Sequence, residues 1–323
     1  MEKIFLTGHR KSGTTLLHAL FDSHPEMNIY PIDICLLYAF LPCQIKMISK
    51  KNFRLRIEHV IKKSTEAIEG KKITHSNACF NCDNFLKYIW EKKNIDDFLT
   101  PGSILKTISE VWCSYFELNT QLPFVFKETS QSINALEIIT ECPDIKFIQI
   151  LRDPRDNYAA LKSGVPKYYC RIGENEMETL ASLINRSRMD FIAARELVEN
   201  KPEIYKVVRF EDLTENPEKQ MAYLSSFCGV NFTDTMTRPT ILSRDFNGNN
   251  HEGKKFLGIS KEHVSTWNER ISKFETGVIE FWMSDVMKYW GYSLSLPCDE
   301  SFRSYSDFYK WYNCRYFYYD SFK

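Results

Sequence analysis

Short apolar runs alternate with segments of helical periodicity along the chain. Four runs have the length and composition of β-strands: KIFLT (3–7), PFVFK (123–127), IKFIQIL (145–151) and EIYKVVRF (203–210). Each is followed by a segment typical of a helix: TTLLHALFDSH (14–24), SINALEIITE (132–141), RDPRDNYAALKSG (152–164) and residues 216–229. This alternation predicts an α/β fold in three layers, with helices covering both faces of a central parallel sheet.

Proline and glycine mark where these helices begin and end. Pro154 directly follows Asp153, which predicts that Asp153 is the N-cap of a helix. Pro25 ends the first helix, and together with Pro31 it predicts that the chain turns back before Asp33. At about 3.3 Å per residue, the segment that ends at Asp33 is long enough to return to the start of that helix.

The regions outside this alternation are less regular, but no repeat or linker divides the chain, so we expect one domain over residues 1–323. Residues 45–72 hold nine Lys and Arg against three Glu. This charge predicts a solvated helical face or a basic rim that attracts an anionic substrate. The aromatic tail, residues 293–323, has eleven aromatics in its last 25 residues, which predicts a packed tail or a contact between the subunits of a homodimer.

Composition narrows the class of protein. The 323 residues carry 42 Lys and Arg against 42 Asp and Glu, and this balance argues against packaging of nucleic acid. The longest apolar stretch, ICLLYAFLPC (34–43), is about half as long as a membrane span. No apolar segment of a secretory signal precedes the loop that begins at Gly8. We therefore expect a cytoplasmic protein with no transmembrane segment and no nucleic-acid partner.

The ten cysteines show no repeating spacing, which favours free thiols over a disulfide framework. His75, Cys79 and Cys82 could supply three ligands of a zinc ion. A structural zinc usually takes four ligands, and no second CxxC pair is present. Free thiols without a metal are therefore the prediction, and the zinc site is the alternative.

The segment LTGHRKSGTTLL (6–17) carries the first candidate chemistry. A strand enters a loop bounded by Gly8 and Gly13, and a helix opens directly after it. Such a loop turns backbone N–H groups inward, and the helix N-terminus adds a partial positive charge, so the loop suits phosphate or sulfate. The candidate binding residues are Arg10, Lys11, Ser12, Gly13, Thr14 and Thr15.

The two glycines have the spacing of a Walker A motif, but the residues around them differ. A Walker A motif has Lys directly after the second glycine, whereas Thr14 follows here and Lys11 lies two residues before Gly13. The order K-S-G-T-T resembles the 5′-phosphosulfate loop of the sulfotransferases that use PAPS (3′-phosphoadenosine 5′-phosphosulfate). This resemblance implies a P-loop-type α/β/α fold, PAPS as the donor, and no metal.

The segment FIQILRDPRDNYAALKSG (147–164) resembles the 3′-phosphate motif of the same family. Arg152 leaves a strand at the sheet edge where ligands of open α/β folds bind, and its planar guanidinium suits a phosphate monoester. The family usually has Ser eight residues after this Arg, but Ala160 stands here, which leaves Ser163 as a substitute. Without the family, Asp153 after an apolar strand is also consistent with the magnesium ligand of a kinase.

Two later segments extend the resemblance. Residues 207–230 are similar to the strand and helix that support the nucleotide in this family. Residues 253–292 resemble its closing segment, a basic loop over the nucleotide followed by a Trp and a long helix. This implies nucleotide contacts for Lys254 and Lys255. Residues 35–120 and the aromatic tail match poorly, and the family's variation there implies an acceptor-binding insertion at 35–120.

The stretch from Pro123 to Arg152 resembles bacterial and Golgi-type members, including the tyrosylprotein sulfotransferases. In these enzymes the Lys that matches Lys127 lies beside the transferring sulfuryl group. Related enzymes often place a Glu, the general base, shortly after the first helix. Asp33 lies roughly where that carboxylate would be.

Other groups were weighed for the role of base. Glu128 is the alternative, although it would point away from Lys127 if the strand continued. His18 and His24 are expected to pack against or cap the first helix.

The sequence therefore predicts an enzyme that transfers a sulfuryl group in line from PAPS to a hydroxyl or amine of an acceptor. The acceptor could be a carbohydrate, a peptide or a small molecule. Lys11, Lys127 and Asp33 are the candidate catalytic residues. The alternatives are a P-loop kinase and a non-catalytic protein that binds PAPS or phosphate, which would keep Arg152 and lose the base and Lys127.

Overall fold

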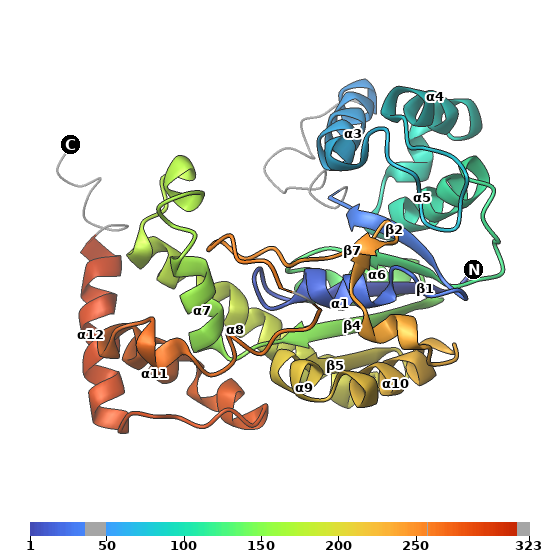
Figure 1. The fold of residues 1–323 in the computed structure, drawn as a ribbon. Coiled ribbons are helices and arrows are strands. Elements are labelled where there is room, and N and C mark those ends of the chain that lie inside the picture. The colour runs from blue at the N-terminus through green and yellow to red at the C-terminus, as the bar shows by residue number, and fades with distance from the viewer. Residues whose placement is uncertain (36–49, 257, 315–323) are drawn as a thin grey trace.

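The computed structural model describes residues 1–35, 50–256 and 258–314 (Figure 1). Five parallel strands form its central sheet, in the order β2-β3-β1-β4-β5. They are β1 (Lys3–Thr7), β2 (Asn28–Asp33), β3 (Phe124–Lys127), β4 (Ile145–Leu151) and β5 (Tyr205–Arg209). A short antiparallel hairpin, β6 (Thr240–Ile241) and β7 (Arg244–Asp245), lies apart from this sheet.

Alternate side chains of the strands enter two hydrophobic cores, one on each face of the sheet. On one face, Phe5 and Phe147 pack with α5 (Pro101–Tyr115), α6 (Ala135–Glu141) and the end of α8 (Glu176–Asn200). On the other, Ile4 and Ile148 pack with α1 (Thr14–Phe21), α9 (Phe210–Glu215) and α10 (Pro217–Cys228). The predicted three layers and parallel sheet are thus confirmed.

The predicted elements agree with the observed ones to within a few residues at their ends. The strands expected at 3–7 and 145–151 coincide with β1 and β4. Asp153 is the N-cap of α7 (Pro154–Lys162), since its side chain accepts a hydrogen bond from the Arg155 N–H at 2.9 Å. That prediction is confirmed, and it places the start of α7 directly after β4.

The turn expected at Pro31 is wrong, because this residue lies inside β2. A proline cannot donate a hydrogen bond to a neighbouring strand, and it is tolerated here because β2 is at the edge of the sheet. Since β2 runs parallel to β3, it carries Asp33 to the edge of the sheet at which Lys127 ends β3. The chain therefore delivers Asp33 by strand pairing rather than by a turn.

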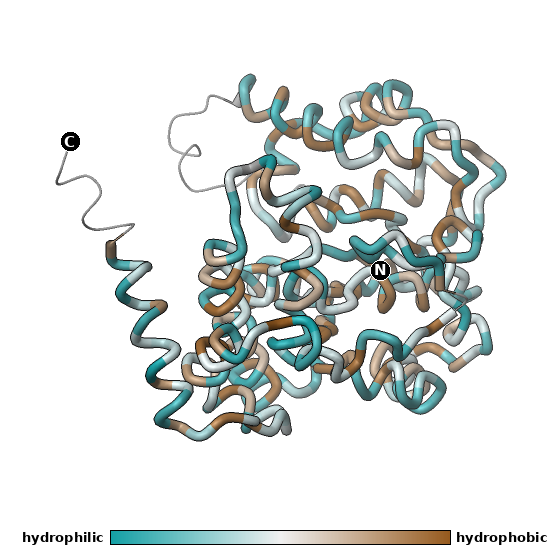
Figure 2. The backbone as a smooth tube through the Cα atoms, turned by 60° about the vertical axis from the view of Figure 1, so that its left-hand side comes forward, coloured by the Kyte–Doolittle hydropathy of each residue, from teal (hydrophilic) through white to brown (hydrophobic). Residues whose placement is uncertain are grey.

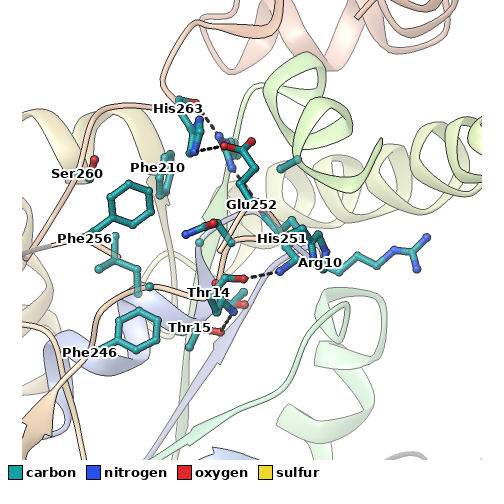
Figure 3. A pocket seen from close by; sticks show the side chains of 18 of the residues that line it. Arg10, Thr14, Thr15, Phe210, Phe246, His251, Glu252, Phe256, Ser260 and His263 are labelled. Atoms are coloured by element: carbon teal, nitrogen blue, oxygen red, sulfur yellow. Dashed lines mark hydrogen bonds and ion pairs between the residues drawn. The ribbon is translucent and has the colours of Figure 1, made fainter. Parts of the chain in front are cut away.

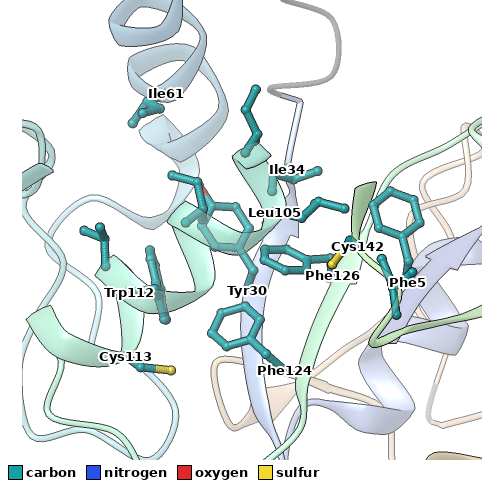
Figure 4. Packing of buried hydrophobic residues seen from close by; sticks show 14 of the residues in the cluster. Phe5, Tyr30, Ile34, Ile61, Leu105, Trp112, Cys113, Phe124, Phe126 and Cys142 are labelled. Carbon is teal, nitrogen blue, oxygen red and sulfur yellow. The ribbon is translucent and has the colours of Figure 1, made fainter. Parts of the chain in front are cut away.

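Residues 50–116 form a helical module beside β2, built from α3 (Lys50–Thr65), α4 (Cys82–Lys92) and α5 (Figure 1). Trp112 is completely buried there and lies beside Tyr30 of β2 (Figure 4). The rings of Phe85 and Phe116 also pack against it. The module shares the hydrophobic core of one sheet face. Basic residues of α3 lie mostly on its exposed side, as a solvated helical face requires.

The chain ends in two helices, α11 (Lys273–Tyr289) and α12 (Cys298–Asn313), which pack against each other. Tyr305 of α12 stacks on Phe281 and Trp282 of α11, at ring-centroid distances of 4.9 and 5.2 Å. The described part of the aromatic tail is therefore packed as predicted, with hydrophobic and hydrophilic positions alternating along α12 (Figure 2). Residues 315–323 and most of the apolar stretch 34–43 lie outside the described residues.

Among the described residues, no helix is both long and apolar enough to cross a membrane.

Replacing Trp112 with Ala is expected to lower the free energy of unfolding by about 3–5 kcal/mol, because it leaves a large cavity between β2 and the helical module. Leu136→Ala is the control: its side chain is 56% exposed, so the loss should stay below about 0.5 kcal/mol. Urea unfolding followed by circular dichroism measures both. Equal losses in the two variants would contradict the packing role of Trp112.

Candidate functional site

A cavity of about 280 Å³ opens at the carboxyl edge of the sheet (Figure 3). Four neighbouring strands deliver residues to it: Asp33 from β2, Lys127 from β3, the loop after β1, and Arg152 after β4. The carboxyl ends of parallel strands form the usual ligand-binding edge of an open α/β sheet. Residues from 246–256 and 258–263, here called the covering segment, also line the cavity.

The loop between β1 and α1 has a backbone conformation that only glycine can adopt at positions 8 and 13. A Cβ at Gly8 would lie 2.4 Å from the carbonyl oxygen of Ile150, and one at Gly13 would lie 2.5 Å from the Phe210 ring. Both glycines have positive φ angles. The loop is thereby pressed against β4 and α9, and the first-turn N–H groups of α1 remain without intrahelical partners.

Asn157 of α7 holds the same loop from the side. Its Nδ2 donates to the Arg10 carbonyl at 2.8 Å, and its Oδ1 lies 2.9 Å from His9 Nδ1. Both Asn157 and His9 are buried, and burial lowers the pKa of His9 to about 3. His9 is therefore neutral and donates to Asn157, which fixes the backbone around Lys11.

Lys11 and Arg152 place two positive charges beside the loop. Lys11 Nζ donates to the Asn249 carbonyl at 2.7 Å. Arg152 donates to the carbonyls of Lys11 at 3.0 Å and His263 at 2.6 Å, and its guanidinium lies 4.6 Å from the centre of the Phe210 ring. Partial burial, and then the Arg152 charge, lower the pKa of Lys11 to about 8.

Lys127 and Asp33 form an ion pair at the other end of the cavity. Lys127 Nζ lies 2.7 Å from Asp33 Oδ2 and 3.4 Å from the hydroxyl of Thr15. The Lys127 side chain is only 4% exposed, whereas that of Asp33 is 37% exposed. Asp33 Oδ1 has no hydrogen-bond partner among the described residues. The structure thus brings three predicted residues, Lys127, Asp33 and Thr15, into contact.

Glu128 does not line the cavity. Its Oε2 accepts a hydrogen bond from the Cys35 N–H at 2.5 Å, and its Oε1 accepts one from the Thr129 N–H at 3.2 Å. Burial, with the Asp33 charge as a smaller cause, raises the pKa of Glu128 to about 8. Glu128 therefore supports the chain directly after β2, where Asp33 ends the strand.

His18 of α1 and His24, which follows the helix, have structural partners. His18 Nε2 donates to the Tyr30 carbonyl at 2.9 Å, and His24 Nε2 donates to the Asn231 carbonyl at 2.8 Å. His75 in turn donates to the His24 carbonyl at 2.9 Å, and Cys82 accepts a hydrogen bond from Thr65. In the described ranges, no group of three His, Cys, Asp or Glu side chains is arranged to hold a metal ion.

Four more of the predicted binding residues line the cavity, but their side chains differ in orientation. Gly13, Thr14 and Ser163 line it, as does Ala160, and the Ser163 hydroxyl donates to the Ala160 carbonyl at 2.9 Å. Arg10 also borders it, but its guanidinium turns toward Glu174 at 3.2 Å and lies over the Tyr169 ring (Figure 3).

Three predicted residues do not line the cavity. Ser12 is buried beneath the loop, where its hydroxyl donates to the His9 carbonyl at 2.6 Å. Lys254 and Lys255 are exposed on the covering segment, and Lys254 pairs with Glu262. The sequence located the basic loop, but neither of its two lysines lines the cavity, and Lys254 contacts it only through Glu252.

Sequence reasoning missed a second set of cavity residues, which come from α9 and from the segment after β7: Phe210, Phe246, Asn249, His251, Glu252, Phe256, His263 and Arg270. The one available signal was the Gly- and Asn-rich run NGNNHEGKK (247–255), which favours a loop close to a ligand. Its position over the cavity depends on tertiary contacts, including Arg152 with His263.

Asp153 is not oriented as a magnesium ligand. Both of its carboxylate oxygens accept hydrogen bonds from the Arg155 guanidinium, at 3.0 and 2.6 Å. Arg155 also pairs with Glu280 at 2.6 Å and lies over the ring of Trp267. This network connects α7 to α11. Because the Asp153 carboxylate is bound to Arg155, it is not free to bind the magnesium ion that a kinase would require.

Comparison with known proteins identifies one family. Residues 3–234 match the model of a group described as the sulfotransferase family. No curated protein sequence matches the chain.

Solved structures of similar fold carry related descriptions. The sulfotransferase domain of the Synechococcus PCC 7002 olefin synthase has a TM-score of 0.57 at 15% identity, over 90% of this chain and 95% of that one. The sulfotransferase domain of the curacin biosynthetic pathway has a TM-score of 0.54 at 15% identity, over 90% and 98%. Sulfotransferase STF9 from Mycobacterium avium has a TM-score of 0.50 at 12% identity, over 91% of this chain and 78% of that one. At these identities the likeness is one of fold.

Anion binding at this site is expected to weaken above pH 8, because the ligand-free Lys11 then loses its proton. A bound phosphate favours the ammonium and returns the pKa of Lys11 toward about 10.4, so affinity should fall by up to about tenfold per pH unit above pH 8. Titration calorimetry with adenosine 3′,5′-bisphosphate (PAP) from pH 6.5 to 9.5 measures this. Lys11→Arg keeps its charge and should lack most of the decline. Parallel profiles for the two proteins would exclude Lys11 as the cause.

Proposed function

The chain belongs to the sulfotransferase family, and we propose that it transfers a sulfuryl group from PAPS to a hydroxyl or amine of an acceptor. The observation that carries this proposal is the convergence of Lys11, Lys127 and Asp33 on one cavity. The same cavity contains the start of α1 and Arg152. Cations, backbone donors and a carboxylate are the groups that sulfuryl transfer needs.

In the proposed reaction, the acceptor oxygen or nitrogen forms a bond to sulfur while the bond from sulfur to the bridging 5′-phosphate oxygen breaks, which releases PAP. By analogy with phosphoryl transfer the transition state is loose, so positioning and charge stabilisation supply most of the catalysis. Lys11 would stabilise the negative charge on the leaving phosphate. Lys127 and the N–H groups of the loop would stabilise the sulfuryl oxygens.

Asp33 is proposed to accept the proton that the acceptor loses. Its Oδ2 is held by Lys127, whereas Oδ1 has no hydrogen-bond partner among the described residues. One oxygen thus fixes the orientation of the carboxylate, and the other, which is buried without such a partner, is proposed to accept the proton of a hydroxyl or amine. The ion pair also places the base beside the cation proposed to contact the sulfuryl group.

The two alternative functions have less support. A kinase would need a Lys where Thr14 stands and a free carboxylate at Asp153, which is instead bound to Arg155. A non-catalytic PAPS-binding protein would lack Lys127 and a base, but Lys127 and Asp33 are both present and paired.

The acceptor is proposed to reach Asp33 from the side of the helical module, residues 50–116, because this module packs on β2. The acceptor's class stays open between carbohydrate, peptide and small molecule. We also propose a cytoplasmic location, supported by the nine described cysteines, which are all free thiols. A homodimer stays a prediction.

The donor is tested by titration calorimetry with PAP, ATP and GTP, each with and without magnesium. PAP is expected to bind more tightly than either triphosphate, and magnesium should not change its affinity. Arg152→Ala should weaken PAP binding by about 1.5–3 kcal/mol, the usual value of a hydrogen bond to a charged group. Tighter binding of ATP with magnesium than of PAP would overturn the proposal.

Asp33→Asn is expected to keep PAP binding and to lower the rate of sulfuryl transfer by about 10²–10⁴, the usual contribution of a general base. The acidic limb of the pH–rate profile should disappear in the same variant. Rates are measured by PAP release with a panel of hydroxyl and amine acceptors, and Glu128→Gln is compared as the competing base. A near-normal rate in Asp33→Asn with a collapsed rate in Glu128→Gln would transfer the role to Glu128.

A further inference from the structure

Glu252 places a carboxylate inside a cavity that is otherwise suited to anions (Figure 3). Its Oε1 accepts a hydrogen bond from Arg270 Nη2 at 2.8 Å. Its Oε2 lies 3.5 Å from His263 Nε2 and 3.5 Å from Lys254 Nζ. Two cationic side chains and a histidine, whose pKa is lowered by burial, therefore surround one acidic group that belongs to the protein itself.

This cluster lies on the part of α7 where the family's serine is missing. Arg270 Nη2 is also 3.4 Å from the carbonyl oxygen of Ala159, and Ala160 lines the same cavity as Arg270. Arg152 reaches the cluster from the other side, because its Nη2 donates to the carbonyl of His263. Arg270 thus lies next to the position at which no hydroxyl is available, and Arg152 lines the same cavity.

The Glu252 carboxylate does not satisfy all the hydrogen-bonding nitrogen atoms of this cluster. Arg270 Nη1, Arg152 Nε and His263 Nε2 are buried without a hydrogen-bond partner among the described residues. Buried donors without partners are costly, and native proteins rarely leave them so. A phosphate monoester has three terminal oxygens and more negative charge than a carboxylate, so it could satisfy donors that Glu252 does not reach.

We propose that Arg270 supplies the contact that Ala160 cannot make, and that Glu252 occupies this place until a 3′-phosphate displaces it. The inference rests on the proposed function, since PAPS is the ligand that brings a 3′-phosphate. Arg270 and Glu252 are then the residues that determine selectivity for nucleotides with this group. A nucleotide that carries only a 5′-phosphate leaves the ion pair of Arg270 and Glu252 intact and gains no binding energy from Arg270.

The test measures the affinities of PAP and AMP for the full chain by titration calorimetry. Arg270→Ala should weaken PAP binding about 10–100-fold, the range expected for a charge-assisted contact, and leave AMP binding unchanged. Glu252→Gln should tighten PAP binding about 3–10-fold, because no internal carboxylate competes for Arg270, and again leave AMP unchanged. If Arg270 and Glu252 had only structural roles, their substitution would leave the ratio of the PAP and AMP affinities unchanged.

Lys273→Ala is the matched control. Lys273 lies three residues after Arg270 and also pairs with a glutamate, Glu300, but neither residue lines the cavity. Its removal should leave both affinities unchanged. Thermal unfolding of each variant shows whether it is folded. If Arg270→Ala is not folded, Arg270→Lys and Glu252→Gln test whether the two residues determine the preference for PAP over AMP.

The outcomes separate this inference from the proposed function. A wild-type protein that does not bind PAP more tightly than AMP contradicts the proposed donor. A wild-type protein that prefers PAP, together with an Arg270→Ala variant of unchanged preference, leaves the donor in place and overturns the role of Arg270. Unchanged PAP affinity in folded Glu252→Gln overturns the role of Glu252.

Discussion

Cations that line a partly closed cavity must find partners, because an unpaired charge removed from water is costly. In the described part of this chain they find them within the protein. Lys127 pairs with Asp33, and Arg270 pairs with Glu252. Arg152 and Lys11 donate instead to backbone carbonyls, and neither forms an ion pair with a carboxylate of the described residues. Of these four cations, an anionic ligand therefore meets two that are paired with a carboxylate and two that donate to carbonyls.

This difference distinguishes the two ends of the cavity. At the Lys127 end, the partner of the cation is the proposed base, so the ion pair is part of the proposed catalytic arrangement. At the Arg270 end, the partner is a glutamate of the covering segment, which a ligand would have to replace. The loop after β1 offers backbone donors and the charge of Lys11, and Arg152 adds its charge from the end of β4.

The scaffold around the cavity is arranged to hold these groups in register. Strand pairing aligns Asp33 with Lys127, and Arg155 connects α7 to α11 through Asp153 and Glu280. Asp22 at the end of α1 accepts hydrogen bonds from the Leu242 and Ser243 N–H groups, which fixes the hairpin that leads into the covering segment. Each of these arrangements includes a contact between elements that are far apart in the sequence.

The sequence by itself determined the strand-helix alternation, the loop with Gly8 and Gly13, the N-cap at Asp153 and the resemblance to the sulfotransferases. These features are local: apolar periodicity, backbone conformation and capping depend on neighbouring residues, so they can be read along the chain. Only the tertiary structure decided that Pro31 lies within an edge strand, because a proline is tolerated there solely when no strand pairs on its outer side. It also decided that Lys254 and Lys255 lie outside the cavity lining while Arg270 and Glu252 belong to it. Side-chain direction in a long loop depends on distant charges, and no local pattern encodes which of several basic residues pairs with Glu252 inside the cavity.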